Sequence, residues 1–87
     1  MISYGVKWRP QALDELRKLP IEIAQRLVKR VDIAKDDPKH FLERLVGDPG
    51  YKLRAGDYRA IIDLLDEEKV MVVRIVGHRK NIYVRNL

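Results

Sequence analysis

The sequence predicts a single α+β domain in which an N-terminal helix hairpin packs on one face of an antiparallel sheet. Apolar residues recur at helical spacing in the first half of the chain, and from Tyr51 onward they recur at the spacing of strands. The length of 87 residues fits one small domain, residues 1–87. The expected order of elements is β-α-α-β-β-β with a polar tail.

The first half of the chain is predicted to form one strand and two helices. One side of the first strand carries alternating apolar residues, namely Ile2, Tyr4, Val6 and Trp8. Pro10 favours the start of a helix, and Pro20 separates it from a second helix. The apolar face of that second helix consists of Ala24, Leu27, Val28, Val31 and Ala34. Residues 36–50 follow as an irregular connection, in which residues 39–45 can form a short turn of helix.

Three further strands are predicted at residues 51–55, 57–65 and 69–77. Hairpin turns at Ala55–Asp57 and Asp66–Glu68 join them. The unbroken apolar run at residues 70–73 indicates a strand that is buried on both faces. A sheet of three or four strands with helices on one side leaves its other face partly open, and we expect Lys and Arg side chains to line that face.

Composition argues against several kinds of site. There is no cysteine, which excludes disulfides and thiolate metal sites and fits a cytoplasmic protein. No run of 18 apolar residues is present to span a membrane, and the N-terminus lacks the pattern of a signal peptide. The two histidines lack the spacing of a catalytic zinc site, and there is no glycine-rich phosphate loop. We therefore expect neither a metal nor a cofactor.

The net charge is +5 and its distribution is uneven. Residues 74–87 contain four cations and no acidic residue, the cations being Arg74, Arg79, Lys80 and Arg85. A basic patch of this kind indicates a polyanion or an acidic protein as partner, and a solubilising surface is the alternative. Arg74 lies among valines in the last strand, where we expect a carboxylate to hold it.

Lys52 and Arg54 point to the same face of their strand, roughly 6–7 Å apart, a distance similar to that between successive phosphates of a nucleic-acid strand. The short turn places Arg59 beside this pair or one strand position away from it. Each arginine alone is readily explained by exposure to solvent or by pairing with Asp57 or Asp63. Three cations on one face are mutually unfavourable, however, and this favours an anionic ligand.

A metal-free set of Lys, Arg and Tyr side chains suits one reaction well, the cleavage of RNA by its own 2′-hydroxyl. The reaction needs a base for the 2′-hydroxyl, cations for the phosphorane and an acid for the 5′-oxygen. Guanidinium groups match phosphate oxygens and supply the electrostatic stabilisation. A lysine or a tyrosine serves as base where neighbouring cations lower its pKa from about 10.

The segments YKLRAGDYR and VGHRKNIY resemble the RelE/ParE superfamily of type II toxins, and the RelE branch most closely. The resemblance covers nearly the whole chain. It implies the α+β fold predicted above, and it implies an endoribonuclease that cuts mRNA on the ribosome and leaves 2′,3′-cyclic phosphate and 5′-hydroxyl ends.

The resemblance also implies roles for single residues. The implied catalytic residues are Lys52, Arg59, Arg79 and Tyr83. Lys52 corresponds to a general base, Arg59 to a phosphate contact, and Arg79 to the residue that stabilises the transition state and serves as acid. Tyr83 corresponds to a ring that stacks on a base or takes part in proton transfer. The candidate RNA-binding residues are Arg54, His78, Lys80 and Arg85.

The partners implied by the resemblance are the ribosome with its mRNA and a RelB-like cognate antitoxin, which binds as a hetero-oligomer and covers the basic surface with acidic residues. No membrane is implied. Two alternatives stay open. One is a ParE-like toxin that inhibits DNA gyrase without catalysis, and the other is a non-catalytic, weakly toxic RelE homologue.

Overall fold

The structure is a computed structural model that describes the backbone of residues 3–86 and the side chains of residues 3–82. Its elements, in chain order, are β1 (Gly5–Trp8), α1 (Pro10–Arg17), α2 (Ile21–Ala34), α3 (Pro38–Phe41), β2 (Glu43–Arg44), β3 (Tyr51–Ala55), β4 (Tyr58–Leu65), β5 (Val70–His78) and α4 (Arg79–Asn86). Among the described residues, no helix is long and apolar enough to cross a membrane.

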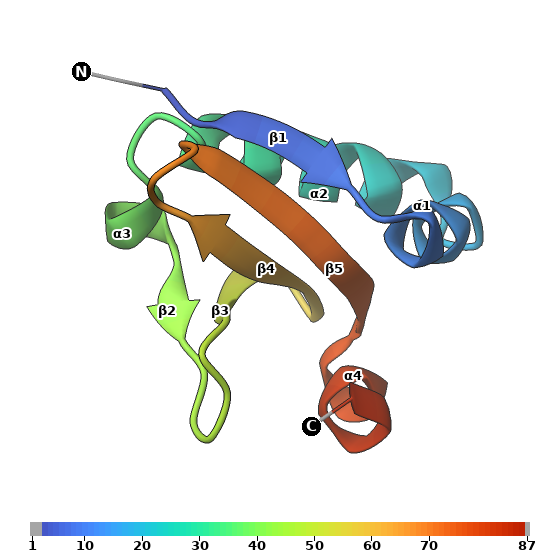
Figure 1. Cartoon of the computed structure of the whole chain (residues 1–87). Coiled ribbons are helices and arrows are strands. Elements are labelled where there is room, and N and C mark those ends of the chain that lie inside the picture. The colour runs from blue at the N-terminus through green and yellow to red at the C-terminus, as the bar shows by residue number, and fades with distance from the viewer. Residues whose placement is uncertain (1–2, 87) are drawn as a thin grey trace.

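The sheet has five strands in the order β1-β5-β4-β3-β2 (Figure 1). The antiparallel core of β3, β4 and β5 confirms the prediction, and β1 adds to it in parallel with β5. The sheet has one strand more than the largest number expected, because Glu43 and Arg44 pair with β3 at its edge. A strand of two residues is too short to show any alternation in the sequence.

Helices α1 and α2 cover one face of the sheet, as predicted (Figure 1). Leu27, Val31 and Ala34 of α2 are buried there, and so is Ala12 of α1. The sheet contributes Leu53, Ala60, Ile62, Met71 and Val73 to the same core. Full burial of each Leu, Ile, Val or Met side chain stabilises the fold by about 1.5–3 kcal/mol.

The opposite face of the sheet is partly covered by α4, where a polar tail was expected. Ile82 is completely buried and packs with Leu45, Ile61 and Ile75 in a second, smaller core. The described part of α4 buries this one apolar side chain, so the sequence shows no amphipathic period that would predict the helix.

A β-bulge decides which side chains of β5 face α4. Ile61 pairs with Ile75 while Ile62 pairs with Val73, which leaves Arg74 as the extra residue. The bulge places Arg74 and Ile75 on the α4 side and moves Val76 into the core under the helices. Strict alternation would place Arg74 and Val76 on the same face of the strand, and the bulge places them on opposite faces.

The predicted turns are both present. Gly56 has a φ of 62° and is the first residue of the two-residue turn between β3 and β4. A positive φ at the first position alone is the pattern of a type II′ turn, which matches the twist of a hairpin. The second turn runs from Asp66 to Lys69 and is one residue longer than expected.

Candidate functional site

Strand β3 presents two cations on the face opposite α1 and α2. Lys52 and Arg54 alternate with Leu53 and Ala55, which are buried under the helices. Glu43 of β2 lies opposite Lys52. Its carboxylate oxygens lie 3.2 Å from Nε of Arg54 and 4.0 Å from Nζ of Lys52. The two cations therefore share one carboxylate.

Arg59 lies directly opposite Arg54 on β4. Its side chain is largely buried, and Nη1 donates hydrogen bonds to the carbonyls of Gly56 at 2.7 Å and Tyr58 at 2.8 Å. Like charges directly opposite each other destabilise a strand pair. The two carbonyls on Arg59 and the carboxylate of Glu43 on Arg54 offset this repulsion.

Arg79 begins α4 and contacts the same turn as Arg59. Its backbone N–H donates to the carbonyl of Asp57 at 2.8 Å, and its Nε lies 3.5 Å from the carboxylate of Asp57. Arg59 is bound to the carbonyl of Gly56, the neighbouring residue of the turn. The turn between β3 and β4 thus brings Arg54, Arg59 and Arg79 to one end of the sheet.

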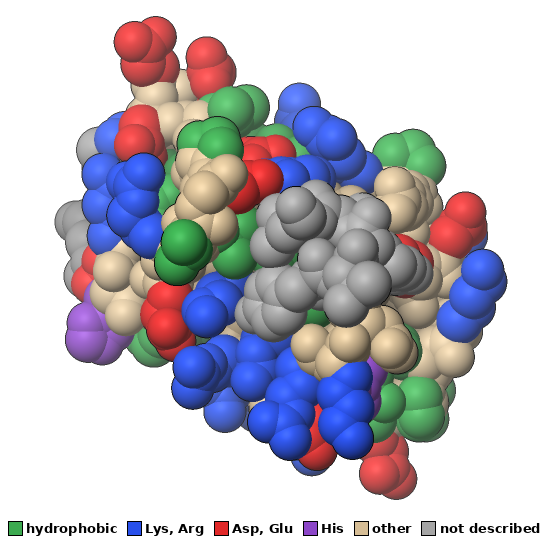
Figure 2. Space-filling view, turned by 90° about the horizontal axis from the view of Figure 1, so that it is seen from below, with side chains coloured by type: hydrophobic (Ala, Val, Ile, Leu, Met, Phe, Trp, Pro, Cys, Tyr) green, Lys and Arg blue, Asp and Glu red, His purple; other side chains and the backbone are tan. Residues whose placement is uncertain are grey.

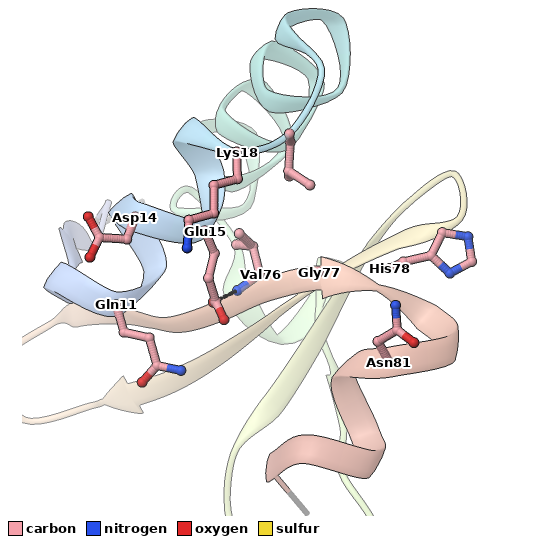
Figure 3. Close-up of a pocket in the computed structure, with 9 residues that line it drawn as sticks. Gln11, Asp14, Glu15, Lys18, Val76, Gly77, His78 and Asn81 are labelled. Atoms are coloured by element: carbon pink, nitrogen blue, oxygen red, sulfur yellow. Dashed lines mark hydrogen bonds between the residues drawn. The ribbon is translucent and has the colours of Figure 1, made fainter.

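The side chain of His78 lies on the face of the sheet that α1 and α2 cover, opposite to the face that carries Lys52 and Arg54. It lies opposite Tyr58, and the two rings meet edge to face with centroids 5.2 Å apart. It lines a cavity of about 360 Å³ between α1 and the end of β5, where Glu15 accepts a hydrogen bond from the N–H of Val76 (Figure 3). The structure does not bring His78 together with Lys52.

The other candidate residues lie on α4 or close to it. Lys80 is exposed, and its backbone N–H donates to Nδ1 of His78 at 3.1 Å. Tyr83 and Arg85 belong to α4, but their side chains lie outside the described residues. Tyr51 and Tyr58 pack on the helix side of the sheet, away from Lys52.

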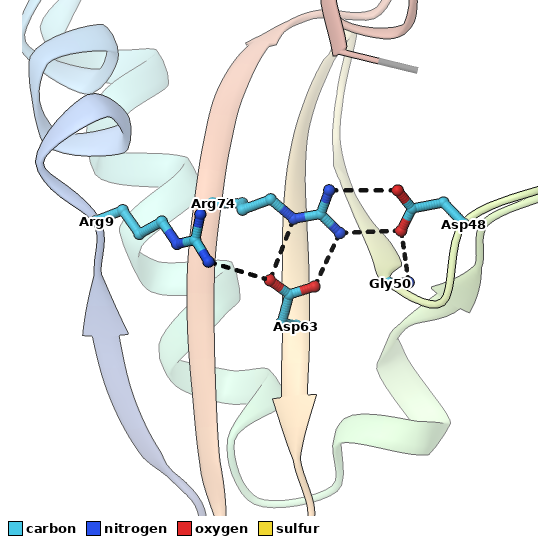
Figure 4. Close-up of polar contacts among 5 residues, drawn as sticks. All are labelled: Arg9, Asp48, Gly50, Asp63 and Arg74. Atoms are coloured by element: carbon cyan, nitrogen blue, oxygen red, sulfur yellow. Dashed lines mark hydrogen bonds and ion pairs between the residues drawn. The ribbon is translucent and has the colours of Figure 1, made fainter.

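A network around Arg74 fixes the loop that leads into β3 (Figure 4). Nη2 of Arg74 donates to Asp48 at 2.9 Å and to Asp63 at 2.8 Å, which confirms that a carboxylate holds Arg74. Arg74 and the N–H of Gly50 lower the pKa of the Asp48 carboxyl. Hydrogen bonds to the two carboxylates raise the pKa of Arg74. Arg9 extends the network, 3.9 Å from Asp63.

Positively charged side chains are concentrated on one part of the surface (Figure 2). On the face drawn in Figure 2, Lys and Arg side chains cluster along the lower part, with few acidic side chains among them. An anionic ligand would be attracted to this side of the molecule.

Comparison with known proteins identifies the family. Residues 6–83 match a family described as the ParE toxin of the type II toxin–antitoxin system parDE. The chain belongs to the RelE/ParE superfamily. The toxin is 34% identical to a putative RelE-like toxin protein of Escherichia coli, over 99% of its own chain and 94% of that protein. It is 30% identical to the mRNA interferase toxin RelE of E. coli K12, over 91% of its own chain and 86% of that protein.

Solved RelE structures share the fold of the toxin. The toxin–antitoxin complex RelBE2 of Mycobacterium tuberculosis has a TM-score of 0.82 at 26% identity, covering 90% of this chain and 100% of that one. A mutant of E. coli RelE in the free state has a TM-score of 0.80 at 29% identity, covering 97% and 92%. These relatives confirm the predicted fold and place the toxin in the RelE type.

Glu43 is the residue of this site that sequence reasoning missed. It belongs to a connection that was predicted to be irregular, and its proximity to Arg54 follows from the two-residue pairing of β2 with β3. Asp48 was missed for a related reason, because its contact with Arg74 depends on the bulge in β5.

Proposed function

We propose that the toxin is an endoribonuclease that cuts mRNA on the ribosome by attack of the RNA 2′-hydroxyl on the adjacent phosphate, without a metal. The observation that carries this proposal is the convergence of Arg59 and Arg79 on the turn between β3 and β4, beside Arg54. Three guanidinium groups at one end of a sheet suit the charge of a phosphorane. The relative named mRNA interferase toxin RelE supports the same activity.

The resemblance to RelE toxins implies a role for each residue of the site. Lys52 takes the proton of the 2′-hydroxyl, and Arg54 and Arg59 bind the phosphate oxygens. Arg79 stabilises the phosphorane and protonates the leaving 5′-oxygen. The hydrogen bonds of Arg59 to Gly56 and Tyr58 fix its guanidinium before RNA arrives, so this part of the site needs no reorganisation during the reaction.

Other candidate residues contact the RNA on either side of the cut. Tyr83 stacks on a base or helps to transfer a proton. Lys80 and Arg85 bind the backbone of the RNA, whereas His78, which was also a candidate, faces Tyr58 on the other side of the sheet. The ribosome holds the mRNA in the geometry that the reaction needs, so that the RNA does not have to find this geometry in a free encounter with the toxin.

The partner that controls this activity is a RelB-like antitoxin in the cytoplasm. Solved relatives of the toxin include the intact E. coli RelBE complex, with a TM-score of 0.74 at 31% identity over 87% of this chain and 96% of that one. Acidic residues of an antitoxin complement the net charge of +5 of this chain.

The test is the substitution Arg79→Ala. We expect cleavage of ribosome-bound mRNA to fall at least 10²-fold, because an electrostatic contact to the transition state is lost. Cuts are measured by mapping transcript 5′ ends after a brief pulse of expression, and folding is checked by circular dichroism. The matched control is Arg17→Ala, which removes an exposed arginine of α1. A folded Arg79→Ala toxin that cuts mRNA at the wild-type rate contradicts the proposal.

Inhibition of DNA gyrase is a second candidate, favoured by the ParE description of the matching family. This activity does not require the cluster of arginines. A supercoiling assay with purified gyrase distinguishes the two functions: inhibited supercoiling with intact transcripts supports gyrase as target, and cut transcripts with normal supercoiling support the ribonuclease.

A further inference from the structure

Three cations of the proposed site are paired with carboxylates of the toxin itself. Glu43 lies against Arg54 and Lys52, and Asp57 lies against Arg79. The groups that would bind phosphate are therefore partly neutralised in the free protein. This contrasts with the excess of positive charge in the chain as a whole.

The geometry of Glu43 imitates a phosphate group. One carboxylate oxygen, Oε1, faces Arg54, and the other, Oε2, faces Lys52. Two oxygens on one centre that each meet a different cation correspond to the two non-bridging oxygens of a phosphodiester. The edge strand β2 holds Glu43 in this place by pairing it directly with Lys52.

Exposure separates Glu43 from the carboxylates that serve as fixed anchors. The side chains of Glu43 and Arg54 are 54% and 60% exposed, whereas Asp48 and Arg74 are 18% and 20% exposed. Lys52 is only 25% exposed, but its contact with Glu43 is long, at 4.0 Å. Exposed ion pairs contribute little to stability, because water competes for both partners. An incoming phosphate can therefore displace Glu43 at small cost, while the anchors of Arg74 stay in place.

We propose that Glu43 is an internal competitor for the phosphate site, and that substrate RNA binds by displacing its carboxylate from Arg54 and Lys52. This inference rests on the proposed function, because it takes RNA as the substrate. Its consequence is a lower affinity for RNA that touches the toxin alone. RNA that the ribosome also holds is affected less, because the additional interactions outweigh one weak ion pair.

The test is the substitution Glu43→Gln, with RNA binding measured apart from cleavage. The probe is a single-stranded oligoribonucleotide with 2′-O-methyl groups, which the proposed reaction cannot cut. We expect Glu43→Gln to bind this probe about two- to fivefold more tightly at low salt, the range that an exposed ion pair allows. The slope of log affinity against log salt should steepen by about 0.7 for each further phosphate that the variant neutralises.

The matched control is Asp32→Asn. It removes the same charge from an exposed ion pair, 2.8 Å from Lys35 on α2, away from the site. It should leave binding and its salt dependence near the wild-type values. Glu43→Asp keeps the charge on a shorter side chain, and its affinity should fall between those of the wild type and Glu43→Gln.

Two outcomes overturn the proposal. One is an affinity of Glu43→Gln no higher than that of Asp32→Asn. The other is tighter binding together with loss of cleavage on the ribosome, which would make Glu43 a catalytic group. A wild-type toxin that cuts no ribosome-bound mRNA refutes the proposed function instead, and the binding comparison still decides whether Glu43 competes for phosphate.

Discussion

Three arginines of this toxin have the same chemistry and different environments. Arg74 is fixed by two carboxylates, Arg59 by two backbone carbonyls, and Arg79 lies 3.5 Å from one exposed carboxylate. A guanidinium that is already fully paired binds a ligand poorly, whereas one held by weak partners exchanges them for phosphate. Arg74 is therefore a structural arginine, and the exposed partner of Arg79 is the one that a substrate replaces most easily.

The hydrogen bonds between Asp48 and Arg74 make the stability of the fold depend on pH. Its pKa is lowered in the folded protein by Arg74 and by the N–H of Gly50. A lowered folded-state pKa stabilises the fold above the unfolded value of about 3.9, and this contribution is lost as pH falls through the lower folded value. We expect Asp48→Asn to be less stable than the wild type at neutral pH and to lose less stability between about pH 5 and pH 2.

Urea unfolding of both proteins across this range measures the difference. Asp32→Asn, which removes one exposed carboxylate of α2, serves as the control for the loss of a charge away from this network. If Asp48→Asn and the wild type lose stability in parallel on acidification, the contact with Arg74 does not account for the acid sensitivity.

At the level of elements, the connection from β2 to β3 packs closely against the guanidinium of Arg74. A Cβ atom on Gly50 would lie 2.5 Å from Nη2 of Arg74 and 3.0 Å from Asp48. Arg74 cannot move aside without breaking its hydrogen bonds to Asp48 and Asp63. Glycine is therefore required here by close approach, and β3 enters the sheet in the register that presents Lys52 and Arg54.

This packing predicts a coupling between two substitutions. We expect Gly50→Ala to destabilise the toxin by about 1–3 kcal/mol, because it disrupts hydrogen bonds of half-buried charged groups. In an Arg74→Gln background the shorter side chain leaves room for the added methyl group, so Gly50→Ala should cost less. A double-mutant cycle by urea unfolding measures the difference, and strictly additive effects would show that the two residues do not compete for space.

At the level of the whole molecule, the sheet separates two cores of unequal size. The larger lies under α1 and α2, and the smaller consists of Leu45, Ile61, Ile75 and Ile82 under α4. The smaller core depends on a single described side chain of α4. Its loss should release that helix while the larger core holds the rest of the fold together.

Ile82→Ala tests this separation. We expect a loss of about 2 kcal/mol, at the low end for Ile→Ala, because the site lies at the edge of the molecule and can relax. Native-state hydrogen exchange should quicken in α4 more than in β4 and β5. Val46→Ala, at an almost fully exposed position, is the control. An equal rise in exchange throughout the sheet would contradict two separable cores.

Features of this fold that depend on contacts within one element could be predicted from the sequence, and features that depend on contacts between distant segments could not. Alternation revealed β3, β4 and β5, and helical spacing revealed α1 and α2, because each pattern reflects burial within one element. The bulge at Arg74, the pairing of Glu43 with Lys52 and the docking of Ile82 arise between distant segments. The pattern of apolar and polar residues within one element therefore cannot predict these contacts. The resemblance to RelE toxins selected Lys52, Arg59 and Arg79, but their partners came from the structure.

The parallel pairing of β1 with β5 has a consequence for synthesis. Residues 5–8 pair with residues 70–73, so the first strand has no neighbour in the sheet until residues 70–73 have been made. Such a long separation in sequence delays folding, because a large loop must close first. The sheet therefore reaches its full five-stranded form only after residues 70–73 have been synthesised.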